Sequence, residues 1–226
     1  MLFRSIAIVL THAHEDHIGA MGWLWPRLRA PIYATPFTAF LLREKMRDAG
    51  CLSEASITEV PLGGKIDLGP FQIELITLTH SIPEPNGLAI RTPLGTILHT
   101  GDWKIDPEPI LGAPTDDVTL RALGDEGVLA MVCDSTNVFV DGHAGSEADV
   151  RVAMFDLLKG LKGRVAVACF ASNVARMHTV IKAAQACGRQ VCLAGRSMQR
   201  MSAAAKSVGM FKEDRKSTRL NSSHSS

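Results

Sequence analysis

The chain has 226 residues, 46% of them hydrophobic and 21% charged, with a formal net charge of +1. These values are typical of a globular protein. The near-zero charge provides no overall attraction to nucleic acid, so a polyanion would have to be bound by a local cleft or by metal. No stretch approaches the roughly 18 consecutive apolar residues of a membrane-spanning helix, and no membrane partner is expected.

The five cysteines form no CxxC pair, and their odd number is typical of reduced thiols in a cytoplasmic protein. Cys133, Cys169 and Cys192 lie in apolar runs, so they are predicted to be small core residues.

Short strands and helices precede two hairpins in the first hundred residues. Thr35 is typical of a helix N-cap, with Pro36 at the first helical position and Gly50 beyond the end of the helix. The other predicted elements are buried strands at 5–10 and 31–35, a short helix at 16–25 closed by Pro26, and hairpins at 65–80 and 87–103.

The pattern changes in the second half of the chain. A helix at 115–127 and a buried strand at 128–137 come first. Ser146 and Asp149 then have the spacing of a capping box, and the alternation that follows predicts a β-α-β-α run with a parallel sheet and with Phe170 in the core. The elements of this run are helices at 146–163, 173–188 and 197–209 and strands at 164–170 and 190–195.

These patterns predict an α/β fold with a seam around residues 137–145. A first domain would cover 1–140 and a second 141–212. Residues 213–226 are polar, serine-rich and without a hydrophobic period, and they resemble translated adapter sequence. They are predicted to form a disordered, non-native tail.

The segment THAHEDHIGA (11–20) concentrates groups that bind metals. His12, His14 and Asp16 alternate, so in an extended segment their side chains leave the same face. The loop can present His12 and His14 to one ion, and Asp16 and His17 to a second. Imidazole and carboxylate suit zinc or manganese, and two ions about 3.5–4 Å apart can share a hydroxide in hydrolysis.

Four ligands in one loop cannot complete two coordination shells, so others are expected elsewhere. His80, in LTHSIPE, and Asp102, in HTGDWK, each follow a predicted strand, and Asp102 could bridge both ions. Taken alone, His80 would more often be a structural or surface histidine and Asp102 a turn residue. Glu15 is expected to face away from the ions, and His99 to face the core or to support the ligands.

Several longer motifs resemble a known family. THAHEDH, His80 and TGDWK are similar to successive motifs of the metallo-β-lactamase fold. SIPEPNGLAIRTPLGTILHTGDWKID, CDSTNVF, FASNVAR and GRSM narrow the resemblance to bacterial ribonuclease J, in the β-CASP branch, from about Ser5 to about Met210. This resemblance implies a partial αββα-type metallo-β-lactamase fold followed by the first part of a β-CASP α/β domain.

The resemblance also implies an activity. Members of this family bind two zinc ions, cleave RNA as 5′-to-3′ exonucleases and endonucleases, and often form homo-oligomers. Their bridging hydroxide attacks the scissile phosphorus. By motif, one ion would be bound by His12, His14 and His80, the other by Asp16 and His17, and both by Asp102.

Further residues would act on the substrate or on the ligands. Asp134, in CDSTN, would join Asp16 and Asp102 as a catalytic residue that orients ligands or moves protons, and a strand-end cap is an equal alternative. Ser172, Asn173 and Val174 would contact RNA, since a strand-to-helix junction suits phosphate. An ordinary N-cap is the alternative there, and Arg176 would pair with phosphate or simply be solvated.

The chain also departs from the family pattern. It is expected to be truncated at both ends, without the initial strands and without the last two histidine motifs. One of these motifs supplies a ligand of the second ion. The set His12, His14, His80 and Asp102 is therefore predicted to bind one ion, and the set Asp16, His17 and Asp102 to bind weakly.

Three functions remain open from the sequence. The first is a piece of a two-metal ribonuclease. The second is a small-molecule hydrolase of the same fold that acts on thioesters or lactones, and the third is an inactive truncated product that binds metal. The helix–strand alternation after Ser146 favours the ribonuclease over the small-molecule hydrolase.

Overall fold

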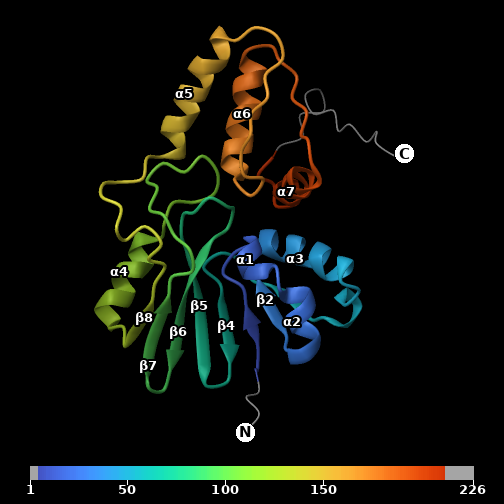
Figure 1. The fold of residues 1–226 in the computed structure, drawn as a ribbon. Coiled ribbons are helices and arrows are strands. Elements are labelled where there is room, and N and C mark those ends of the chain that lie inside the picture. Colours follow the sequence, from blue (N-terminus) through green and yellow to red (C-terminus); the bar gives the residue numbers. More distant parts are fainter. Residues whose placement is uncertain (1–4, 212–226) are drawn as a thin grey trace.

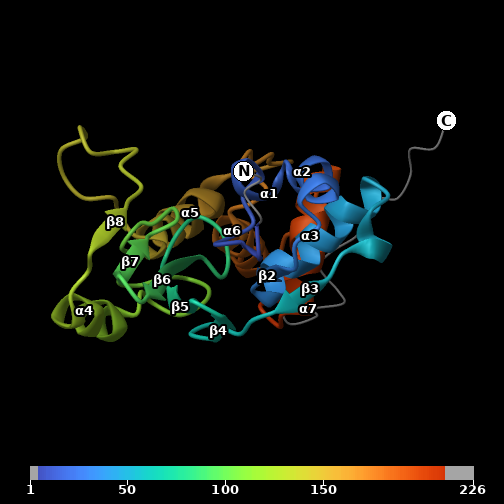
Figure 2. The ribbon, with the colours of Figure 1, turned by 90° about the horizontal axis from the view of Figure 1, so that it is seen from below.

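Two β-sheets lie between two layers of helices in the first part of the chain (Figures 1 and 2). The computed structural model describes residues 5–211, and the predicted tail at 213–226 lies outside them. Parallel strands form the smaller sheet, in the order β1 (Ile8–Val9), β2 (Ile32–Ala34) and β3 (Ile57–Glu59).

The larger sheet is antiparallel except for its last pair. Two hairpins form most of it, as the sequence predicts, and the parallel strand β8 pairs with β7 at the edge. Its strands in spatial order are β4 (Lys65–Leu68), β5 (Phe71–Thr77), β6 (Asn86–Thr92), β7 (Gly95–His99) and β8 (Ala130–Val132).

Helices cover the outer face of each sheet. Figure 2 shows α2 (Met21–Leu28) and α3 (Pro36–Asp48) beside the smaller sheet and α4 (Asp117–Glu126) beside the larger one. Apolar side chains from both sheets, such as Tyr33 and Leu75, pack between them. The predicted α/β class is confirmed, and burial from both sides explains the apolar runs of the central strands.

The start of α3 shows how local sequence sets an element. Thr35 is extended and acts as the N-cap, Pro36 opens the helix, and Gly50 has a φ of 74° just beyond its end, all as predicted. The carboxylate of Glu84, from a distant loop, accepts a hydrogen bond from the backbone N–H of Phe37 at 2.8 Å. This contact satisfies one of the N–H groups that a helix start leaves free.

Three predictions in the first part are wrong. The strand predicted as buried at 5–10 covers only Ile8–Val9, both half-buried, and Ile6 is 48% exposed. Pro26 does not close the helix at 16–25. That segment forms α1 (Glu15–Ile18) and then α2, in which Pro26 lies two residues before the end. Burial of Met21 and Trp25 stabilises α2 despite the hydrogen bond that Pro26 cannot donate. The strand at 128–137 is short and exposed, because β8 is an edge strand.

The second part of the chain, as far as residue 211, contains three helices, α5 (Glu147–Gly160), α6 (Val174–Ala186) and α7 (Arg196–Ser207). The capping box of Ser146 and Asp149 is confirmed. Between residues 146 and 211 the structure has no strand, only an isolated bridge at Val191. The strands predicted at 164–170 and 190–195, and their parallel sheet, are therefore wrong.

The burial of several apolar residues also differs from the prediction. Phe170 is 85% exposed rather than in the core. Cys133 and Cys169 are half-buried and Cys192 is exposed, whereas Cys51 is the buried cysteine. These residues lie on or near segments without two covered faces, so their apolar character does not bury them.

The second part packs on the first through α7 and α3. Ala204 and Ala205 are fully buried in the same cluster as Phe37 and Leu42 of α3. An ion pair between Arg200 and Asp48, with a 2.8 Å nitrogen–oxygen distance, lies at this contact. In the described part of the chain, no helix has the length and apolarity needed to cross a membrane.

Candidate metal centre

Loops at one end of the two sheets carry the predicted metal ligands. His12 and His14 follow β1 in an extended segment, and α1 begins directly after His14, which places Asp16 and His17 on its first turns. His80 comes from the loop between β5 and β6, and Asp102 from the loop after β7. Three separate chain segments, each following a strand, therefore meet at this end.

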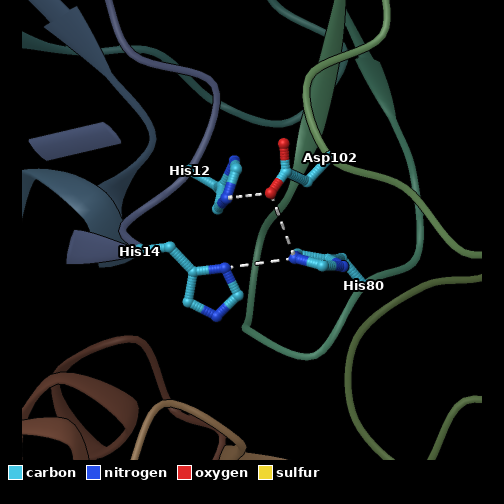
Figure 3. Close-up of side chains that lie close together, drawn as sticks. All are labelled: His12, His14, His80 and Asp102. Atoms are coloured by element: carbon cyan, nitrogen blue, oxygen red, sulfur yellow. Dashed lines mark hydrogen bonds and ion pairs between the residues drawn. The ribbon is translucent and has the colours of Figure 1, made fainter. Parts of the chain in front are cut away.

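The first group consists of His12, His14, His80 and Asp102 (Figure 3). His80 Nε2 lies 3.1 Å from His14 Nδ1. Asp102 Oδ2 lies 3.8 Å from His12 Nε2 and 3.8 Å from His80 Nε2. One ligand atom of each residue lies within 4.8 Å of the others, so all four can face one ion.

The second group consists of Asp16, His17 and Asp102. His17 Nε2 lies 3.3 Å from Asp102 Oδ1 and 3.5 Å from Asp16 Oδ2. Asp102 thus directs one carboxylate oxygen to each group, the arrangement expected of a bridging ligand. The second group has three residues, and the side chain of Asp16 is 75% exposed.

The imidazoles of the first group are held neutral. Burial, with the neighbouring histidines, lowers the pKa of His12 to about 2. Burial and His80 lower the pKa of His14 to about 4, and burial lowers the pKa of His80. Neutral imidazoles keep the nitrogen lone pairs that metal binding requires.

A cation at this centre would also resolve an otherwise costly feature of His12. Its Nε2 is fully buried and has no hydrogen-bond partner, although it faces the centre of the first group. An unpaired buried polar atom is unfavourable. Three neutral nitrogens and one carboxylate form a donor set that fits zinc or manganese.

Several supporting contacts were not predicted from the sequence. His12 Nδ1 lies 3.0 Å from the hydroxyl of Thr11. The buried Asn86 donates its side-chain N–H to the carbonyl of Thr11 and its backbone N–H to the same oxygen, at 3.4 and 3.1 Å. These contacts fix the loop that carries His12. The turn-forming residues around Asn86, in PEPNG, are the sequence feature that could have indicated a loop at this position.

His99 and Glu15 lie outside both groups. The Nδ1 of His99 accepts a hydrogen bond from the backbone of Gly101 at 2.9 Å, so it supports the loop of Asp102. Glu15 is exposed and pairs with Lys45 at 2.6 Å.

Asp134 lies at the end of β8 and joins neither metal group. Its carboxylate accepts hydrogen bonds from the backbone and hydroxyl of Thr136, which lower its pKa. Its backbone carbonyl accepts from the Trp103 indole at 3.4 Å. The structure thus places Asp134 in a turn next to the loop of Asp102. Burial lowers the pKa of His80, and the charge of Asp134 only partly opposes that lowering.

Ser172, Asn173 and Val174 lie at the start of α6. The Asn173 side chain is the N-cap and accepts from the backbone of Arg176 at 2.8 Å. The Val174 side chain is fully buried in the core shared with α3, so only its backbone can meet a ligand. The Arg176 guanidinium pairs with Glu147, through two hydrogen bonds of 3.0 Å.

Comparisons with known proteins give the family context. Residues 4–168 match the metallo-beta-lactamase superfamily, and residues 162–224 match the ribonuclease J beta-CASP domain. A ribonuclease J from Sinorhizobium meliloti is 49% identical over 205 residues, which are 91% of this chain and 36% of that protein. A ribonuclease J from Corynebacterium glutamicum is 45% identical over 95% of this chain and 30% of that protein.

A solved structure supports the same fold. A protein of unknown function from Enterococcus faecalis superposes with a TM-score of 0.67 over 97% of this chain and 52% of its own, at 18% identity. This likeness concerns the fold alone. The chain spans about a third of the length of the ribonuclease J proteins that it matches.

Proposed function

The chain belongs to the metallo-beta-lactamase superfamily, in its ribonuclease J branch, and from that premise we propose that it carries the metal-binding half of a ribonuclease active site. The proposed reaction is hydrolysis of RNA phosphodiester bonds, in 5′-to-3′ exonucleolytic and endonucleolytic modes. The observation that carries the proposal is the position of Asp102, with one carboxylate oxygen toward each ligand group.

The surroundings of these residues support the ligand roles that we propose for them. His12, His14 and His80 would bind one zinc ion through neutral nitrogens. Asp16 and His17 would bind a second ion, and Asp102 would bind both. Manganese is the alternative metal. When bound, two such ions supply a hydroxide at neutral pH and stabilise charge on the phosphate that it attacks.

The remaining residues would act on the RNA. Ser172 and the backbone N–H groups at the start of α6 are proposed to contact a phosphate, because a helix start presents N–H groups and a partial positive charge. Asn173 would maintain that start as its N-cap. Asp134 is proposed to orient the loop that carries Asp102 and to aid proton movement near His80.

Metal content of the purified chain is the first test. We expect about one tightly bound zinc per chain and a weaker second site, because the first group has four ligands and the second has three. His12→Ala should remove the tight equivalent, whereas His143→Ala, a change of an exposed loop histidine outside both groups, should leave it in place. Mass spectrometry of the metal measures both.

Substrate class is tested on the zinc-loaded chain. Cleavage of single-stranded RNA that is lost in His12→Ala and kept in His143→Ala supports the proposal. Hydrolysis of a thioester with RNA left intact, or equal zinc content in wild type and His12→Ala, would contradict it.

A further inference from the structure

A continuous series of hydrogen bonds connects the metal centre with the start of α6. It begins at Thr79, directly before His80. The Thr79 carbonyl accepts from the backbone N–H of Lys104 at 2.8 Å, and its hydroxyl donates to the Lys104 carbonyl. The backbone N–H of Asp106 donates to the same hydroxyl at 3.0 Å. The loops of His80 and Asp102 are therefore joined to each other.

Asp106 carries the series to the second part of the chain. Its side chain is buried, and its carboxylate accepts from the Ser146 hydroxyl at 2.7 Å and from the backbone N–H of Glu147 at 3.1 Å. Burial raises the pKa of Asp106, but these hydrogen bonds outweigh burial and hold it below its usual range. An ionised carboxylate at a helix start is favourable, so Asp106 fixes the start of α5.

Glu147 carries the series on to α6. Its carboxylate accepts from Asn173 Nδ2 at 3.1 Å and from Nε and Nη2 of Arg176, both at 3.0 Å. The Glu147 side chain is 17% exposed and that of Arg176 is 29% exposed. A two-point contact between guanidinium and carboxylate fixes both position and angle.

This pairing changes the role expected of Arg176. An arginine beside a proposed phosphate site would ordinarily be assigned to the phosphate. Here two of its donors are used by Glu147, and the pair has no net charge. Glu147 and Ala175 also line a small cavity of about 70 Å³ together with His80, Lys104 and Asp106, so the start of α6 lies near the metal loops.

We propose that Glu147 is a positioning residue, which holds Ser172 and Asn173 in a fixed place relative to the metal centre, with Arg176 as its counter-ion rather than a phosphate ligand. The contact of Ser172 and Asn173 with RNA rests on the function proposed above. The coupling of Glu147 with Arg176 and Asn173 rests only on their hydrogen bonds.

Hydrogen exchange tests the coupling of Glu147 with Arg176 and Asn173 without RNA or metal. Glu147→Ala and Arg176→Ala should each increase deuterium uptake in peptides that cover residues 170–178 by several-fold, because the first turn of α6 loses its anchor. Glu126→Ala is the matched control. It breaks another two-point contact, with Arg91 at the far side of the larger sheet, and should leave these peptides unchanged. Unchanged uptake in Glu147→Ala would overturn the proposal.

RNA affinity then separates the two roles of Arg176. With zinc-loaded chain and a short labelled single-stranded RNA, fluorescence anisotropy should show that Glu147→Ala and Arg176→Ala each weaken binding by about tenfold, and that the double variant is no weaker than either. Zinc content should stay unchanged. If Arg176 instead binds phosphate, Glu147→Ala will tighten binding and Arg176→Ala alone will weaken it, and the proposal fails.

Two further outcomes distinguish the proposed function from the role of Glu147. If the wild-type chain binds no RNA, the proposed function fails, while the exchange result still decides the role of Glu147. If Glu147→Ala does not fold, Glu147→Gln replaces it, because glutamine keeps an acceptor for Asn173 and removes the charge opposite Arg176. That variant should show the exchange increase at Arg176 with less change at Asn173, and no increase at either residue would refute the coupling.

Discussion

Gly101 determines how closely the loop of Asp102 approaches the loop of His12. It has a φ of 59°, which places it in the left-handed region. A Cβ at this position would lie 2.9 Å from the carbonyl oxygen of Asn86 and 3.1 Å from the Thr11 Cβ. Both neighbours support the loop of His12, so the absence of a side chain at Gly101 lets the Asp102 loop come close to the His12 loop.

Gly101→Ala should therefore damage both stability and metal binding. We expect a loss of about 2–3 kcal/mol in the free energy of unfolding, from left-handed strain and from the contact with backbone, and a loss of bound zinc. Urea denaturation and metal analysis measure the two effects.

The matched control is Gly112→Ala. Gly112 has a φ of 82°, but a Cβ there would meet open space. This variant should lose only about 1 kcal/mol and keep its zinc. Equal losses in the two variants would show that the contact with Asn86 and Thr11 has no role.

At the level of elements, β8 is exposed because it lies at the edge of the larger sheet. Among residues 5–211, its only strand partner is β7. Met131 and Val132 are 58% and 54% exposed. An exposed apolar edge strand is a site where another chain can pair, so β8 is expected to favour aggregation.

Met131→Lys tests this expectation. A charge on an exposed edge side chain should reduce light scattering at high protein concentration, while the free energy of unfolding changes by less than about 0.5 kcal/mol. Leu98→Lys, on the neighbouring strand and packed against the buried residues below α4, should destabilise the fold instead. Unchanged scattering in Met131→Lys would remove β8 as the cause.

Helices were predicted better than strands for a physical reason. A helix satisfies its backbone within its own segment, so local signals such as Ser146 with Asp149 suffice for α5. A strand needs a partner that the local pattern does not name. Residues 164–170 and 190–195 contain apolar runs with valines, yet they have no ladder partner in the described chain, and Phe170 is exposed as a result.

At the scale of the whole molecule, burial of the histidine cluster couples folding to pH. The pKa of His12 is about 2 in the folded chain and 6.5 as a reference for the unfolded one. Between these values the unfolded state binds a proton that the folded state excludes. The stability of the metal-free chain should therefore fall as the pH decreases from about 6.5 toward 2.

The expected size is measurable. At pH 5, His12 alone should lower the free energy of unfolding by on the order of 2 kcal/mol relative to pH 7.5. Urea denaturation in the presence of a chelator measures it. His12→Asn, which cannot bind the proton, should show a smaller difference between the two pH values. The same difference in both proteins would mean that His12 does not titrate between the two states.

The sequence by itself determined the types of the candidate ligands, the α/β class and the positions of most helices, because these depend on spacing and local capping. His12, His14, Asp16 and His17 are neighbours in the chain, so their common chemistry could be predicted without a fold. His80 and Asp102 were identified as candidate ligands from the strands that they follow and from family resemblance.

Only the tertiary structure decided which groups face one another. The two oxygens of Asp102 point to different ligand groups because Gly101, Asn86 and Thr11 bring two distant loops together. Arg176 pairs with Glu147 because α5 and α6 start side by side. Such long-range contacts depend on packing between segments far apart in the sequence, and no local pattern encodes them.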